Sequence, residues 1–71
     1  MLSDPALALE VHARLLEARA TLANSVSSIK GRCSDTEYVE YRSMIGKVLG
    51  DLILDVIEPI KATHPSLIFP E

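Results

Sequence analysis

The stretch from Tyr38 to Ile60 is apolar around most of the circumference of any helix that it forms. The polar residues Glu40, Lys47, Asp51, Asp55 and Glu58 fall on one narrow stripe. The apolar surface consists of Val39, Tyr41, Ile45, Val48, Leu49, Leu52, Ile53, Leu54, Val56 and Ile57. Several neighbours have to cover a helix of this kind. Because a chain of 71 residues has room for only one other long helix, we expect a second copy of the chain to supply the remaining cover.

The first helix is expected over residues 4–30. Ser3 is a favoured N-cap residue, and Pro5 suits the first helical turn. Apolar residues then recur at steps of three and four, as in an amphipathic helix; they are Leu7, Ala8, Val11, Leu15, Ala18, Leu22, Val26 and Ile29. Glu10 and Arg14 form an i,i+4 pair on the opposite face. Lys30 followed by Gly31 indicates the end of the helix.

The second helix is expected over residues 35–58, after a turn at residues 31–34. Ser34 and Glu37 have the spacing of a capping box. Pro59 ends or kinks the helix, because proline lacks an amide donor and clashes with the preceding turn. A further helical turn over residues 60–64 is open as an alternative.

A C-terminal tail is expected over residues 59–71. It contains the apolar trio Leu67, Ile68 and Phe69. We expect this trio to fold back over the end of the core rather than to act as a docking peptide for another protein.

These elements predict an all-α fold with a single helical-hairpin domain over residues 1–71. The short turn makes the two helices antiparallel, and two hairpins then dimerise into a four-helix bundle. The expected dimer interface consists of Tyr41, Ile45, Gly46, Leu49, Gly50, Leu52, Ile53 and Val56. Gly46 and Gly50 lie four residues apart on one helix face, where they are either merely tolerated or the site of a close helix crossing.

Composition excludes several classes of function. The hydrophobic content of 48% is typical of a folded domain. Because the net charge is −3 and the basic residues are scattered along the sequence, we expect no nucleic-acid partner. Charged residues interrupt the most apolar stretch before it reaches the length of a membrane span. The first residues lack the positive start and apolar core of a signal peptide, and Cys33 is the single cysteine. We therefore expect a cytoplasmic protein without a membrane partner.

The side chains that could form a metal or catalytic site have interpretations that need no such site. Asp51, Asp55 and Glu58 share a helix face, but no Glu-x-x-His motif accompanies them, so we expect a solvated stripe rather than a metal site. His12 is expected at the surface or in an interface. Cys33 lacks a nearby histidine or second cysteine in the sequence, so we expect a surface thiol. No cofactor is expected.

The sequence favours a small dimeric protein that acts through protein–protein interaction, as an adaptor, regulator or assembly factor. The expected partner is a second copy of the chain, and another protein is a second candidate partner. The alternative is a small-molecule-binding protein or an enzyme with a site between subunits. Residues that could supply such a site are Glu10, Arg14, Arg42 and Lys47, with Tyr38 and Tyr41 near the turn.

Overall fold

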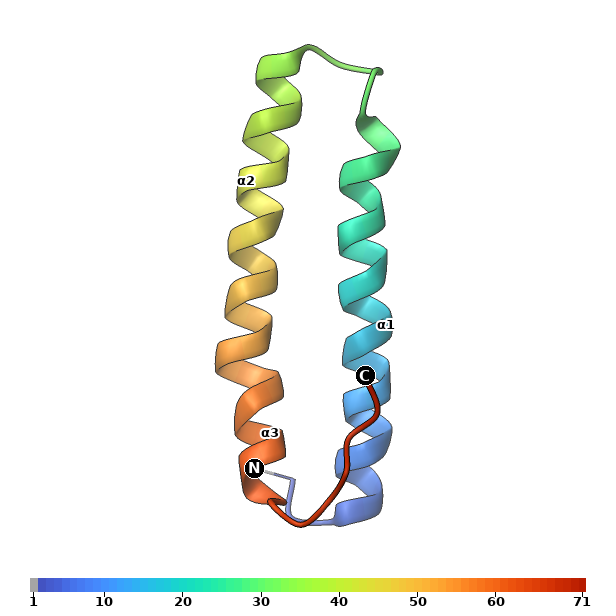
Figure 1. Ribbon diagram of the computed structural model, residues 1–71, viewed down its shortest axis with the longest axis vertical. Helices are drawn as coiled ribbons and strands as arrows, with labels where there is room; N and C mark the ends of the chain where they lie inside the picture. The colour runs from blue at the N-terminus through green and yellow to red at the C-terminus, as the bar shows by residue number, and fades with distance from the viewer. Residues whose placement is uncertain (1) are drawn as a thin grey trace.

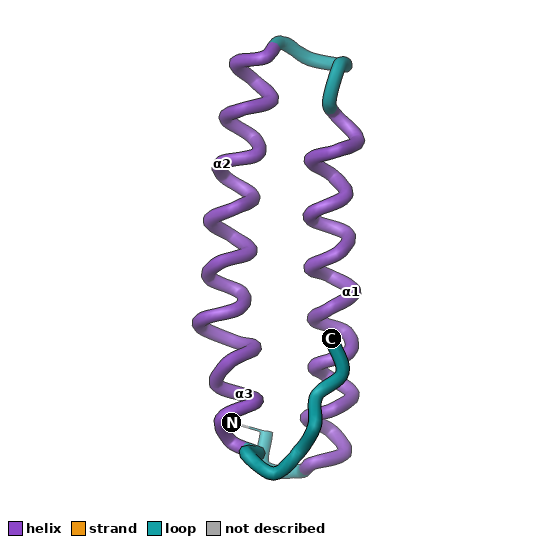
Figure 2. Tube along the Cα trace, viewed as in Figure 1, coloured by secondary structure: helices purple, strands orange, loops and turns teal. Residues whose placement is uncertain are grey.

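A computed structural model, which describes residues 2–71, shows that the chain folds into a hairpin of two long helical rods (Figure 1). One rod is α1 (Pro5–Ile29). The other consists of α2 (Asp35–Leu52), the π-helix η1 (Ile53–Ile57) and α3 (Glu58–Thr63), which follow one another without a break. Figure 2 shows the two rods side by side, joined by a short turn at one end. The predicted all-α hairpin is confirmed.

The first helix begins one residue later than the sequence suggested, because Asp4 rather than Ser3 is its N-cap. The Asp4 carboxylate accepts hydrogen bonds from the backbone N–H groups of Ala6, at 2.9 Å, and Leu7, at 3.3 Å. Aspartate caps a helix as well as serine does. With Asp4 as the cap, Pro5 occupies the first helical position, where a missing N–H costs nothing.

The turn and the start of the second rod follow the sequence closely. Gly31 has φ +80°, a backbone conformation that glycine adopts without strain. The Ser34 hydroxyl accepts from the Glu37 backbone N–H at 3.1 Å, and the Glu37 carboxylate accepts from the Ser34 N–H at 3.1 Å. The predicted capping box is therefore confirmed.

The second rod continues to Thr63 instead of ending near residue 58. The helix continues through Pro59, where a break was expected, because a π-helical turn precedes this residue. In that turn the Glu58 N–H bonds to the carbonyl of Ile53, five residues back. Wider spacing of this kind relieves the crowding that a proline ring causes in an α-helix. The chain leaves the helix at His64, directly before Pro65, so the alternative of a further helical turn is the correct one.

The core lies at the end of the hairpin opposite the turn. Ala8, Ile60 and Phe69 form its buried centre. Partly buried apolar side chains pack around them, namely Leu2, Leu9, Val11, Leu15, Val56 and Leu67. Residues 64–71, hereafter the C-terminal segment, run back along α1 (Figure 1). This path brings Phe69 into the core and Leu67 against it, as the sequence predicted, whereas Ile68 of the apolar trio is exposed.

The single chain is elongated, with extents of 46 × 16 × 14 Å. Its radius of gyration is 15.0 Å, whereas a compact domain of this length has a radius of about 11 Å. Most of the rod pair therefore has no third layer over it, and only the end with the C-terminal segment has a covered core.

Candidate interaction surface

No residue of α2 is buried, although the helix spans Asp35–Leu52. Large apolar side chains on it are exposed to solvent: Val39 by 51%, Met44 by 65% and Val48 by 48%. Leu54 in η1 is exposed as well. Scattered apolar residues are normal at a protein surface. A long helix without one buried side chain, however, gains little free energy from packing within its own chain.

The exposed apolar residues of the second rod lie on two sides of its contact with α1. Val39, Gly46, Gly50 and Leu54 are separated by steps of seven, four and four, so they share one side, which we call the glycine face. Met44 and Val48 are four residues apart on the other side. Between these two sides, half-buried residues of α2 face α1.

The glycine face is open in the single chain. A Cβ atom added to Gly46 or Gly50 would meet no atom within 4 Å, apart from the neighbouring residues and backbone of its own helix. The two glycines are therefore not needed for the approach of α1 to α2. Glycine destabilises a helix interior by about 1 kcal/mol relative to alanine, and nothing inside the hairpin offsets that effect.

The residues that the sequence singled out for a dimer interface divide into two groups. Tyr41 points towards α1, where its hydroxyl lies 2.7 Å from that of Ser25, and Val56 packs on the buried core. These two side chains are engaged within the hairpin. Ile45, Leu49, Leu52 and Ile53 are half-buried. Gly46 is exposed and Gly50 is half-buried on the open glycine face.

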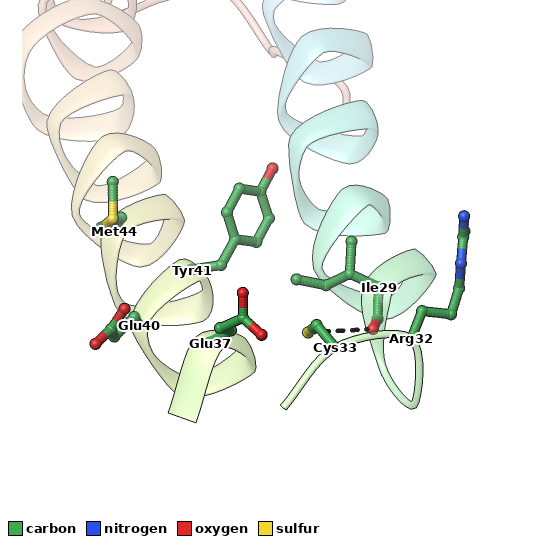
Figure 3. Close-up of a pocket in the computed structure, with 7 residues that line it drawn as sticks. All are labelled: Ile29, Arg32, Cys33, Glu37, Glu40, Tyr41 and Met44. Atoms are coloured by element: carbon green, nitrogen blue, oxygen red, sulfur yellow. Dashed lines mark hydrogen bonds between the residues drawn. The ribbon is translucent and has the colours of Figure 1, made fainter. Parts of the chain in front are cut away.

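An open hollow of about 420 Å³ lies between the rods beside the turn (Figure 3). Its lining is mixed and consists of Ile29, Arg32, Cys33, Glu37, Glu40, Tyr41 and Met44. In Figure 3 the Arg32 side chain extends away from the hollow, and its guanidinium donates to the Ser28 carbonyl at 3.2 Å. The Cys33 thiol is turned to the Ile29 carbonyl, at 3.6 Å. Charged groups therefore do not converge on a ligand position here.

Of the residues considered for a small-molecule site, the single chain brings Arg42 and Tyr38 into contact but does not gather the others around them. Arg14 pairs with Glu17 at 3.6 Å, not with Glu10 as the spacing suggested. Arg42 lies over the ring of Tyr38, with its guanidinium carbon 5.6 Å from the ring centre. Lys47 is exposed on the far side of α2 and does not line the hollow by the turn.

Asp51, Asp55 and Glu58 are all exposed, as a solvated stripe requires. Within residues 2–71, no three His, Cys, Asp or Glu side chains gather as metal ligands would. In the same part of the chain, no helix combines the length and the apolar character that crossing a bilayer demands.

His12 is buried, with 3% of its surface exposed, so the expectation of a surface or interface position is wrong. Its ring lies against that of Phe69, with centroids 4.9 Å apart. Burial lowers the pKa of His12, and the positive charges of Lys61 and Arg19 lower it further, while Glu71 acts in the opposite direction. The signal in the sequence was the four-residue step from Ala8, which places both residues on the same helix face.

The fold and this surface together define an all-helical hairpin whose second rod is largely uncovered. Searches with the sequence and the structure found no matching family model, no similar curated protein and no similar solved structure.

Proposed function

We propose that the chain is a small helical protein that acts through protein–protein contact, and that its first partner is a second copy of itself. The observation that carries this proposal is the absence of any buried residue in α2. In the proposed dimer, two hairpins pack through their glycine faces into a four-helix bundle. A two-fold axis brings the same face of each chain together. Contacts with other proteins, as an adaptor, regulator or assembly factor, would use the surface outside this interface.

The exposed area of the chain supports a dimer of ordinary size. The hairpin exposes 5062 Å², whereas a compact monomer of 7.8 kDa exposes about 4,400 Å². The excess, about 700 Å², is close to the roughly 800 Å² that each partner contributes to a standard interface. A dimer would thus bring the exposed surface of each chain near that of a compact protein.

The glycine face is favoured over the opposite side of α2 because close backbone approach needs small residues. Gly46 and Gly50 lie on the outer surface of the helix, with Val39 and Leu54 as apolar residues on either side of them. A neighbouring helix that crosses over two glycines makes dense van der Waals contact with the backbone. That contact offsets the low helix propensity of both residues.

The test is the oligomeric state at micromolar concentration, measured by sedimentation equilibrium. We expect the mass of two chains for the natural sequence. Val39→Lys places a charge in the glycine face and should shift the equilibrium to monomer, by about tenfold or more in the dissociation constant. Glu40→Gln is the matched control, since it makes the same change in net charge on the exposed stripe and should leave the dimer intact.

Two results would overturn the proposal. One is a natural protein that is monomeric at these concentrations with its full helical circular dichroism. The other is a dimer that tolerates Val39→Lys as well as it tolerates Glu40→Gln, because this outcome would place the interface elsewhere.

A further inference from the structure

The C-terminal segment covers a buried titratable group that the proposed dimer does not use. His12 lies in α1, one helical turn after the buried residue Ala8. The ring of Phe69 lies over it at a centroid distance of 4.9 Å, with the two ring planes inclined by 58°. Phe69 also packs against Ile60 of α3 in the same buried cluster. Removing the segment would therefore expose His12 and open the centre of the core.

The charges that face His12 come from each element packed around it. Lys61 of α3 and Arg19 of α1 are positive, and Glu71 of the C-terminal segment is negative. A proton on His12 would add another positive charge to a ring that Lys61 and Arg19 already influence and that is only 3% exposed beneath the segment. Burying a charge without a close partner is costly, so the charged ring is better accommodated when the segment has left.

We propose that residues Leu67–Glu71 form an acid-releasable strap, which lies over His12 while the imidazole is neutral and lifts from α1 when the imidazole gains a proton. The contact is limited enough for such release. A hollow of about 250 Å³ is left between α1 and the strap, lined by Leu9, His12, Ala13, Leu16, Ile68 and Pro70. Ile68 is 90% exposed, so Phe69 is the main anchor of the strap.

The direction of the pH dependence follows from the protonation of the two states. The pKa of His12 is lowered from 6.5 when the strap is docked, and it returns towards that value when the strap is released. The docked state therefore binds fewer protons. Docking of the strap is strongest above pH 6.5. It weakens as the pH falls from 6.5 to the lowered pKa that His12 has in the docked state. Within that interval the docking constant falls by up to about tenfold per pH unit.

The second histidine has a different role. His64 Nε2 lies 2.6 Å from the carbonyl oxygen of Leu2. A carbonyl oxygen only accepts, so Nε2 carries a hydrogen in this bond, whether or not the ring is charged. Protonation of His64 therefore preserves its contact with Leu2. His64→Gln serves as a control that leaves the response of the strap to acid in place.

The experiment uses the single phenylalanine of the chain. Replacing it biosynthetically with 4-fluorophenylalanine puts one ¹⁹F probe at position 69 of the full chain. Between pH 8 and pH 5 we expect the resonance to move towards the position of a solvent-exposed fluorophenyl ring and to narrow. Far-UV circular dichroism should keep its helical amplitude over the same range, because only the strap moves.

Three variants separate His12 from general acid effects. His12→Gln should remove the fluorine response. Glu71→Gln removes the negative charge that favours the imidazolium, so release should begin at higher pH. Lys61 belongs to α3 and stays in place when the strap lifts, so Lys61→Gln raises the pKa of His12 in both states and should move the release interval to higher pH. The shifts in Glu71→Gln and Lys61→Gln keep the test valid if His12→Gln weakens docking at every pH.

The proposal is overturned by a resonance that stays unchanged from pH 8 to pH 5. It is also overturned if the response persists in His12→Gln, or if helical circular dichroism is lost together with the fluorine shift. The last result would mean that acid unfolds the whole hairpin rather than releasing the strap.

Discussion

The hydroxyl oxygens of Ser25 and Tyr41 lie 2.7 Å apart and join α1 to α2 near the turn. The Ser25 hydroxyl also donates to the carbonyl of Leu22 at 2.6 Å. A serine hydroxyl has one hydrogen and a carbonyl oxygen has none, so Tyr41 is the donor in the bond between the helices. This bond fixes the register of the two rods in a region without buried residues.

The bond predicts a measurable coupling between the two residues. Tyr41→Phe and Ser25→Ala should each lower the free energy of unfolding by about 1 kcal/mol. The double variant should lose clearly less than the sum, since both changes remove the same bond. Chemical denaturation of the four proteins gives the coupling energy. Additive losses would mean that the hydroxyl groups do not interact in solution.

The anchoring role of Phe69 predicts a strong contrast with its neighbour. Phe69→Ala should lower the free energy of unfolding by about 2 kcal/mol, because it removes a buried ring from the contact with Ala8 and Ile60. Ile68→Ala is the matched control, since Ile68 is almost fully exposed, and should change stability by less than about 0.5 kcal/mol. Equal effects of the two substitutions in thermal or urea denaturation would contradict the docking of the segment.

The capping box predicts a dependence of stability on pH at the start of α2. The hydrogen bond from the Ser34 backbone, followed by that from its side chain, lowers the pKa of Glu37 from its usual value of 4.5. The folded state therefore favours the ionised carboxylate. Its contribution is fully present above pH 4.5 and is lost as the pH falls through the lowered pKa.

Two substitutions test this contribution. Glu37→Gln should flatten the acid limb of the stability curve, measured by denaturation between pH 6 and pH 3. Ser34→Ala keeps the backbone N–H that bonds to the Glu37 carboxylate, so it should flatten the acid limb only in part, while it lowers stability by about 1 kcal/mol at neutral pH because it removes the helix cap. An acid limb that is identical in Glu37→Gln and in the natural protein would contradict the reciprocal bonds.

The hairpin could be predicted because its signals are local. The capping box needs only Ser34 and Glu37, and the end of α1 needs only a glycine that tolerates positive φ. The prediction of Ser3 as the N-cap of α1 was wrong because Ser3 and Asp4 are both good caps. The position of Pro5, which suits the first helical position, decides between them. The π-turn before Pro59 depends on how the whole rod accommodates the ring, which no single residue indicates.

The candidate sites show the same limit more clearly. The spacing of Gly46 and Gly50 is visible in the sequence, but the absence of α1 atoms around them becomes known only once the helices are placed. Burial of His12 results from its contact with Phe69, which is distant along the chain. The four-residue step from Ala8 places His12 on the buried face of α1, but it does not indicate the path of the C-terminal segment that covers this face.

The glycines provide a final prediction that separates the hairpin from its dimer. Gly31 has φ +80°, so Gly31→Ala should lower the free energy of unfolding by about 1 kcal/mol through backbone strain. Gly46 lies in a helix with open space around it. Within a single hairpin, Gly46→Ala should therefore raise stability by about 1 kcal/mol, because alanine has the higher helix propensity.

In the proposed dimer, the same methyl group at position 46 would lie between two crossing helices and push them apart. Gly46→Ala should then increase the dissociation constant in sedimentation equilibrium while it raises the stability of the dissociated chain. Gly31→Ala is the control, since its methyl group lies in the turn, away from the glycine face, and should leave the dissociation constant unchanged once its folded fraction is taken into account. A Gly46→Ala protein that is more stable and equally dimeric would show that the second copy packs on another part of the rod.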